Sequence, residues 1–363
     1  MGRKRCILVT VLIIFLSLFF DLAKAQNKIL MKSVEYDVPV FNENAYDFRY
    51  GTANNDWWDG NIETSKRSAF QKAIIEKAST GAINVYGDDG KLLSAKDVDL
   101  ILSHKETLRY QQTLPPFQQY DTVISGKLFY GDIQYLRFRE QWSYDAKTFK
   151  ITKQITGYAP VWVEYDQNNK KTGKTKALFW IHYSDSEKKN YQPLTDLISY
   201  NLPLFAVIDQ PQFINLFHCS NDTMLRKQYV DSLTHYAENN KVKIYDCNDI
   251  EGFFNDDQDS ISALKKEGAF FKFNEIDSMT LTRNEPPYET YDTVILKSLD
   301  RYKIIGLKFF EKWMIDGKTL EIKKEILGFT TLIDIFDYDE KFTGMQKLFY
   351  FSFDKPTENF KLK

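Results

Sequence analysis

One stretch of this chain occurs twice, and the repetition constrains the possible folds more than any other feature. Residues 115–157 align with residues 286–328 at one constant offset and without a gap, and 20 of the 43 aligned positions are identical. Upstream, residues 73–87 align with residues 232–246. We therefore expect two similar units in tandem, with the boundary near residues 192–198.

The core of the repeat is predicted to be a β-hairpin. Apolar and polar residues alternate over 136–142 and again over 149–155, which is strand periodicity on both sides of a turn. The sequence Asp-Ala-Lys-Thr at 145–148 supplies the turn, and Asp-Gly-Lys-Thr supplies it in the second unit. A hairpin of this kind fixes which residues of the two strands are opposite each other.

The predicted register brings opposite charges together on the apolar side of each hairpin. Centring the turn on residues 146 and 147 pairs Glu140 with Lys153, and the same alignment pairs Glu311 with Lys324. We interpret these as structural cross-strand ion pairs that fix the register. A catalytic acid–base role is the alternative, but a register pair explains the same residues without a substrate.

The coarse fold prediction is α+β, with two similar domains. Each domain is expected to have short N-terminal helices, beginning near Thr64 and Ser94 in the first unit, and an antiparallel β-meander of two consecutive hairpins. A chain of this length is also expected to form two domains. The expected segments are a signal peptide (1–25), an N-terminal arm that is extended or irregular (26–61), a first unit (62–192) and a divergent second unit (193–363).

The N-terminus is typical of a secretory signal peptide. Arg3, Lys4 and Arg5 precede an apolar run over 7–20, and Ala-Lys-Ala at 23–25 provides the small residues of a cleavage site. The run is shorter than the ~20 residues that span a bilayer. We expect an exported protein whose mature net charge is about −5, which gives no indication of nucleic-acid binding.

Two cysteines, Cys219 and Cys247, remain after the predicted cleavage. Both belong to the second unit, and the aligned positions of the first unit are Gly60 and Asp88. In an exported protein this pattern indicates a disulfide. The alternative is a pair of buried, unbonded thiols.

The residues that carry chemistry are sparse. His104, His182, His218 and His235 do not have metal-ligand spacing. The sequence has no nucleophile-elbow motif and no phosphate-binding glycine loop. We expect no catalytic residues, no metal site and no cofactor.

The motifs of the first unit resemble one protein family. They are Glu-x-Trp-x-x-Asp-x-Lys at 140–147, Gly-Tyr-Ala-Pro at 157–160 and Leu-Phe-Trp-Ile-x-Tyr-x-Asp at 178–185. This order resembles the gliding-motility protein family GldN, also called PorN, of the type IX secretion machinery. The second unit departs from it, since Gly-Phe-Thr-Thr replaces Gly-Tyr-Ala-Pro at 328–331.

The resemblance implies a non-enzymatic periplasmic subunit that is peripheral to the outer membrane. In that reading it assembles with a GldK/PorK-type outer-membrane lipoprotein and other subunits of a secretion ring, and it is a possible homo-oligomer. An exported module that binds glycan or peptide is the alternative, and a hydrolase would need two converging carboxylates. The candidate partner contacts are Trp57, Trp58, Trp142, Tyr158, Trp162 and Trp180; burial within the protein is the other reading for Trp57 and Trp58.

Overall fold

A computed structural model describes most of the chain beyond the predicted signal peptide. Residues 1–26 and the pair Trp57 and Trp58 lie outside the described residues. The described ranges are 27–40, 62–111, 113–128, 130–165, 171–183, 189–204, 217–219, 223–239, 241–247, 268, 274–298, 304–336 and 342–353.

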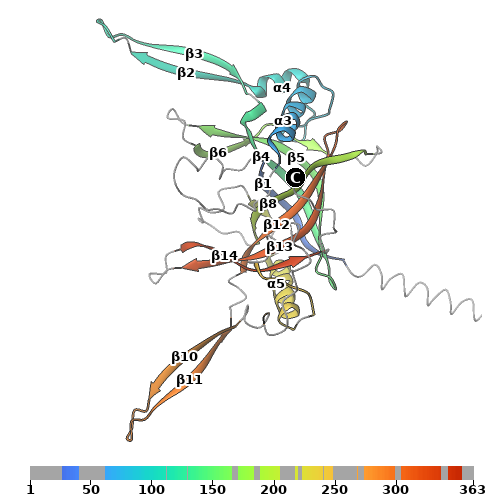
Figure 1. Cartoon of the computed structure of the whole chain (residues 1–363). Helices are drawn as coiled ribbons and strands as arrows, with labels where there is room; N and C mark the ends of the chain where they lie inside the picture. The colour runs from blue at the N-terminus through green and yellow to red at the C-terminus, as the bar shows by residue number, and fades with distance from the viewer. Residues whose placement is uncertain are drawn as a thin grey trace, which may run out of the picture.

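The fold is α+β and mostly antiparallel sheet, with helices at its ends (Figure 1). The helices are α3 (Thr64–Ser79), α4 (Ala95–Leu102) and α5 (Thr223–Glu238), with a short 3-10 turn η1 (Tyr130–Asp132). The start of α4 follows the sequence prediction, because Ser94 and Asp97 form a reciprocal capping box. No helix among the described residues has the length and apolar character needed to cross a membrane.

The first large sheet has the strand order β6-β5-β4-β1-β9, and β7 also pairs with β5. Its central pair, β4 and β5, is the hairpin predicted from the repeat. The strands are β1 (Asn27–Pro39), β4 (Ile133–Asp145), β5 (Ile151–Tyr165), β6 (Lys171–Ala177), β7 (Ile181–His182) and β9 (Phe217–Cys219).

The second large sheet has the order β14-β13-β12-β8. It contains the second copy of the predicted hairpin as β12 and β13. The strands are β8 (Tyr191–Pro203), β12 (Ile304–Asp316), β13 (Ile322–Phe336) and β14 (Phe342–Ser352).

The inner faces of the two large sheets pack against each other. Trp142 of β4 meets Phe309 of β12, and Phe138 of β4 meets Trp313 of β12, each with ring centroids 5.2 Å apart. One large core cluster includes buried residues from both sheets. We use "first half" for the described residues from 27 to 183 and "second half" for those from 189 to 353; the halves share this core instead of having one each.

The N-terminal arm over 26–61 was expected to be extended or irregular, and its first part is an extended strand of the first sheet. Residues 27–39 form β1, which lies between β4 and β9 inside the first sheet. Val34, Tyr36 and Val38 are buried and alternate along this strand, because successive side chains of a strand point to opposite faces. In the second sheet β8 has the same place beside β12. A boundary between residues 192 and 193 would divide β8.

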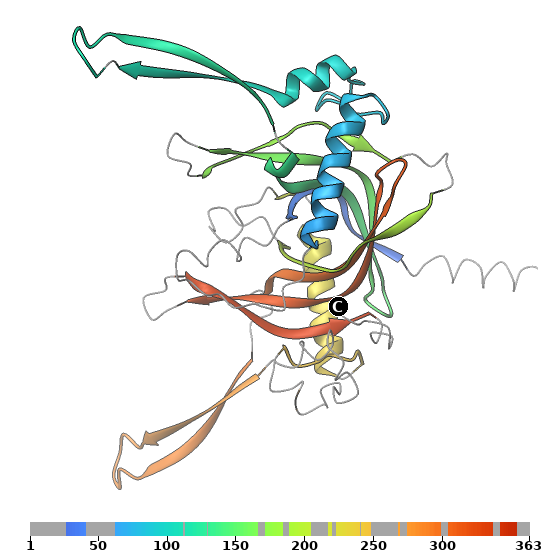
Figure 2. The same cartoon turned by 45° about the horizontal axis from the view of Figure 1, so that its top comes forward.

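Two further hairpins project from the body of the molecule. The first arm is β2 (Ser103–Gln111) with β3 (Gln119–Lys127), and the second arm is β10 (Asn274–Thr282) with β11 (Thr290–Ser298). Each is a two-stranded sheet by itself. Figures 1 and 2 show the arms leaving the body at opposite ends.

Candidate functional site

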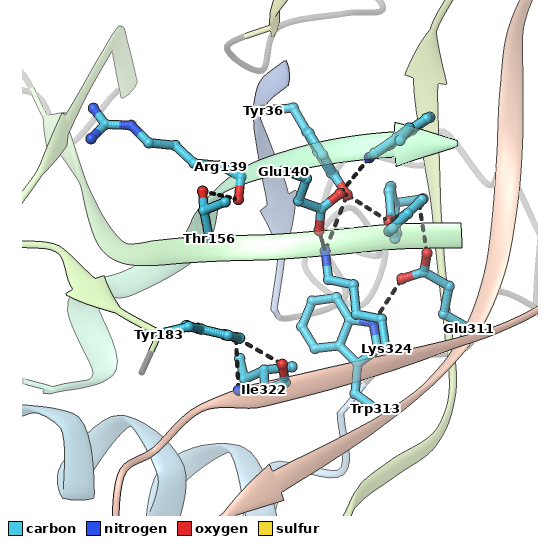
Figure 3. Close-up of polar contacts among 12 residues, drawn as sticks. Tyr36, Arg139, Glu140, Thr156, Tyr183, Glu311, Trp313, Ile322 and Lys324 are labelled. Atoms are coloured by element: carbon cyan, nitrogen blue, oxygen red, sulfur yellow. Dashed lines mark hydrogen bonds and ion pairs between the residues drawn. The ribbon is translucent and has the colours of Figure 1, made fainter. Parts of the chain in front are cut away.

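Four buried charged residues lie at the centre of the shared core. Lys153 Nζ is 2.6 Å from Glu311 Oε1, and Lys324 Nζ is 2.8 Å from Glu140 Oε1. All four side chains are fully buried in these pairs. Figure 3 shows Lys324 reaching Glu140 from the opposite sheet. We call these four residues the charge centre.

The structure corrects the predicted partners of these charges. We expected Glu140 to pair with Lys153 and Glu311 with Lys324, each within its own hairpin. Instead, each lysine pairs with the glutamate of the other half. The ion pairs therefore join the two sheets and do not fix the register inside either hairpin.

The reason for the correction is the turn. The loop is longer than expected: Asp145 N–H donates to Lys150 O, and Phe149 has a left-handed φ of 57° and a buried side chain. Trp142 is thus opposite Lys153, and Glu140 is opposite Ile155 in the same register, which continues as far as a bulge between 139 and 140. Between the turn and the bulge the register is shifted by two residues, which keeps the side chains on their predicted face, so the glutamates and lysines still point inward.

Hydrogen bonds satisfy the remaining polar atoms of the charge centre. Tyr36 Oη donates to Glu140 Oε2 at 2.7 Å, and Trp142 Nε1 donates to the same oxygen at 2.6 Å. On the other side Lys153 Nζ donates to Tyr200 Oη at 2.8 Å, and Trp313 Nε1 donates to Glu311 Oε2 at 2.8 Å. A buried ion pair is tolerable only when its other donors and acceptors are satisfied in this way.

Aromatic rings complete the shell around the two ammonium groups. Lys153 Nζ is 3.4 Å from the centroid of Phe309, and Lys324 Nζ is 3.2 Å from the centroid of Phe138. In both cases the ring belongs to the other half. Desolvated cation–π contacts add to the attraction, so these contacts also act between the halves.

Burial and charge oppose each other in setting the protonation states. Burial lowers the pKa of Lys153 to about 8, although the Glu311 and Glu140 carboxylates counteract it. Burial alone would raise the pKa of Glu311, but the Lys153 and Lys324 charges outweigh it and hold that pKa below its usual value. Burial raises the pKa of Tyr36 and Tyr200 well above 10, so both phenols stay protonated. Lys153 and Glu311 therefore form a charged pair at neutral pH.

Side chains of each half also donate hydrogen bonds to the backbone of the other half's hairpin turn. From the second half, Tyr229 Oη of α5 donates to Phe149 O at 3.1 Å. From the first half, Lys77 Nζ of α3 donates to Gly317 O at 2.8 Å, and Tyr158 Oη donates to Leu320 O at 2.8 Å. The helices and the ion pairs thus interlock the two halves.

Most of the predicted partner contacts are not accessible. Trp142, Tyr158 and Trp180 are buried, so the expectation that they contact a partner is wrong. Trp180 is covered because the Arg139 guanidinium lies 3.5 Å from its ring centroid, and its Nε1 donates to Asp88. Trp162 is partly buried at the edge of the core.

The disulfide expected between Cys219 and Cys247 stays a prediction, because the side chain of Cys219 lies outside the described residues. The strand pairings show where the two residues lie. Cys219 is in β9 and pairs with Val34 of the first sheet, whereas Cys247 follows Tyr245, which bridges to Tyr350 of the second sheet. The two cysteines are therefore attached to different sheets.

The accessible apolar side chains are concentrated on the arms, which the sequence analysis did not single out as contacts. Leu114 is 74% exposed at the tip of the first arm, and Tyr288 is 60% exposed at the tip of the second. The available signal was the Pro-Pro-aromatic sequence at 115–117 and 286–288. The other exposed apolar residues of the arms are Phe117, Met279, Leu281, Tyr291, Val294 and Leu296.

The described residues offer no geometry for a metal, since no group of three or more His, Cys, Asp or Glu could hold one. Within the described residues the charge centre is fully buried, and the two arms carry exposed apolar side chains.

One known family matches the sequence. The sequence matches the family of the gliding motility associated protein GldN over residues 21–203, half of the chain, and the chain belongs to this family. The matched part begins before β1 and ends at the last residue of β8. The family consists of structural components of gliding motility and type IX secretion and is not a known enzyme family. No curated protein matches the chain.

Proposed function

We propose that the mature protein is a non-enzymatic, periplasmic structural subunit of the type IX secretion or gliding machinery. Its partner in this proposal is a GldK/PorK-type outer-membrane lipoprotein, with which it forms part of a ring. The observation that carries the proposal is the match to the GldN family over residues 21–203. The N-terminal pattern of basic residues, apolar run and Ala-Lys-Ala supports export.

The charge centre supports a structural role over a catalytic one. Glu140 and Glu311 occupy the same position in the two hairpins, and each is held by a lysine and a tryptophan N–H. A general acid or base has to reach the proton that it transfers. Neither carboxylate is exposed for that purpose.

We further propose that the two halves arose as a tandem duplication of the family unit. The order strand, helix, projecting hairpin and three-stranded meander occurs in both halves. The left-handed residues Phe117 and Phe149 recur as Tyr288 and Leu320 at the same offset as the sequence repeat. A subunit with two similar surfaces suits a repeating assembly, because a tethered second contact acts at high effective concentration.

Deletion of the gene and in-cell crosslinking test the functional proposal. We expect deletion to impair secretion or surface spreading, and a plasmid-borne wild-type copy to restore both. Crosslinking with mass spectrometry of a tagged copy should recover a lipoprotein or another secretion component. Normal secretion after deletion, together with recovery of the tagged protein alone, would overturn the proposal and favour an exported binding module.

A further inference from the structure

Each of the two arms is a two-stranded hairpin whose outer strand edges are unpaired in the described part of the chain. The strands of each arm pair with each other and with no other strand in the described part of the chain. A lone two-stranded hairpin is marginal in water, and an open strand edge is a template for pairing with another chain. Each arm therefore presents backbone edges that another strand can occupy.

The second arm exposes apolar side chains on both of its faces. Leu281 is opposite Tyr291 on one face, next to Met279, and Val294 and Leu296 lie on the other. All five side chains are exposed. Burying such surface is favourable by roughly 25 cal/mol per Å², so a partner that covers the arm gains from both faces.

The arms of one molecule do not cover each other. They leave the body at opposite ends in both views (Figures 1 and 2), and the interlocked halves hold those ends apart. Any contact between a first arm and a second arm is therefore a contact between different molecules.

The charges of the arms favour some pairings between arms of different copies over others. In the second arm Glu275, Asp277, Glu285, Glu289 and Asp292 outnumber Arg283 and Lys297, which gives a net charge of −3. In the first arm Lys105 and Arg109 balance Glu106 and Asp121, and Lys127 forms an ion pair with Asp99 of α4, so this arm has no excess of negative charge. Two second arms side by side would place like charges together, whereas a first arm beside a second arm avoids this repulsion.

We propose that the first arm of one copy of this chain pairs with the second arm of another copy, so that copies join head to tail. Such a heterologous contact produces an open chain or closes into a ring. The inference rests on the proposed function in that a ring subunit needs a repeating contact. The contact itself is a property of the purified chain and is measured without the secretion machinery.

Intermolecular crosslinking of the full-length mature chain tests the contact. One preparation carries Leu114→Cys and is ¹⁵N-labelled, and the other carries Tyr288→Cys at natural abundance. Treatment of the mixture with a short bis-maleimide should link residue 114 of a labelled chain to residue 288 of an unlabelled chain, as identified by mass spectrometry. Neither preparation alone should yield a link between two tips.

Sedimentation velocity at increasing protein concentration supplies the quantitative readout. Wild-type protein should associate with concentration. Val294→Ser/Leu296→Ser should weaken the association by about tenfold or more, as expected when anchors of an interface are truncated. The matched control is Leu100→Ser, which removes an equally exposed leucine from α4 outside the arms and should associate like the wild type.

A wild-type chain that stays monomeric at all concentrations would overturn the proposal, and so would links confined to pairs of identical tips. Equal association of Val294→Ser/Leu296→Ser and wild type would also overturn it. These results are separable from the functional test. If the protein is monomeric but deletion of the gene impairs secretion, only the proposed arm contact is refuted. If the protein self-associates but deletion leaves secretion normal, only the proposed function is refuted.

Discussion

At the scale of single residues, Lys153 and Glu311 show how the core tolerates charge. Each is fully buried, yet each has an opposite charge within hydrogen-bond distance and further hydrogen-bond partners. Removing one member of such a pair costs far more than replacing both, because a lone buried charge loses hydration without compensation. The same reasoning applies to Lys324 and Glu140.

Glu311→Ala should lower the free energy of unfolding by about 3–5 kcal/mol, because it leaves the buried Lys153 without its carboxylate partner. The double variant Lys153→Met/Glu311→Leu, which removes both charges and keeps apolar volume, should recover most of that loss. Urea denaturation of both variants and of wild type measures the differences. Small and equal losses in the two variants would contradict the buried geometry.

Asp316 should make the protein sensitive to acid. Hydrogen bonds from the Thr319 and Asn190 backbone N–H groups lower the pKa of its carboxylate from 3.8 to about 2. Because the folded-state pKa lies below the ordinary value, the unfolded state binds more protons between about pH 4 and pH 2. The stability that Asp316 contributes is therefore complete above about pH 4 and is lost as the pH falls toward 2.

Asp316→Asn measures this contribution. The difference in unfolding free energy between wild type and variant should be constant from pH 7 to pH 5 and should shrink as the pH approaches 2. Asp145→Asn is the matched control, because Asp145 accepts the same turn hydrogen bonds from Lys147 and Thr148. None of the hydrogen bonds described for Asp145 corresponds to the one that Asp316 accepts from Asn190. Its difference should change less with pH. A pH-independent difference for Asp316→Asn would refute the assignment.

At the scale of elements, the sequence predicts more about faces than about registers. Alternation over 136–142 identified β4 and its inward side chains correctly. It could not reveal that Phe149 adopts a left-handed conformation and turns into the core, and this lengthens the loop and shifts the register by two residues. The strand β1 was missed although Val34, Tyr36 and Val38 alternate, because polar neighbours and a short pattern made the segment look irregular.

The glycines of the hairpins provide an element-scale test. A Cβ added at Gly328 of β13 would lie 2.5 Å from Phe351 O and from Tyr350 Oη of β14. Gly328→Ala should therefore push β13 and β14 apart and cost about 1–3 kcal/mol of stability. Thermal or urea denaturation measures the loss.

Gly317→Ala is the control for this substitution. Nothing lies within 4 Å of its Cβ position, and the corresponding turn position of the first half is already alanine, at Ala146. It should be neutral or stabilise by up to about 1 kcal/mol through the unfolded chain. Equal destabilisation by the two substitutions would show that the close approach at Gly328 is not what matters.

At the scale of the whole molecule, the two halves form one interlocked body that carries the arms at opposite ends. The repeat predicted two similar units, and the aligned glutamates and lysines predicted buried charge. Neither could show that Lys153 reaches Glu311, because periodicity reports the face of a side chain and not which distant strand that face meets. The packing of the two sheets determines that Glu311 is the partner of Lys153, and the local sequence pattern does not show how the sheets pack.

A double-mutant cycle distinguishes the observed pairing from the predicted one. The coupling energy between Lys153 and Glu311, measured with Lys153→Met and Glu311→Leu, should exceed that between Lys153 and Glu140, measured with Glu140→Leu. Direct contacts in buried pairs couple by about 0.5–3 kcal/mol. A larger coupling within the hairpin would restore the local pairing that the sequence suggested.

The central claim, that the crosswise contacts make the halves one cooperative unit, is tested most directly by native-state hydrogen exchange with mass spectrometry. In the wild type, peptides from β4–β5 and from β12–β13 should show the same opening free energy, since globally opening elements share one value. In Glu311→Ala, where only the second half is altered, both hairpins should lose protection equally. Loss confined to β12–β13, with β4–β5 still protected as in wild type, would contradict the claim.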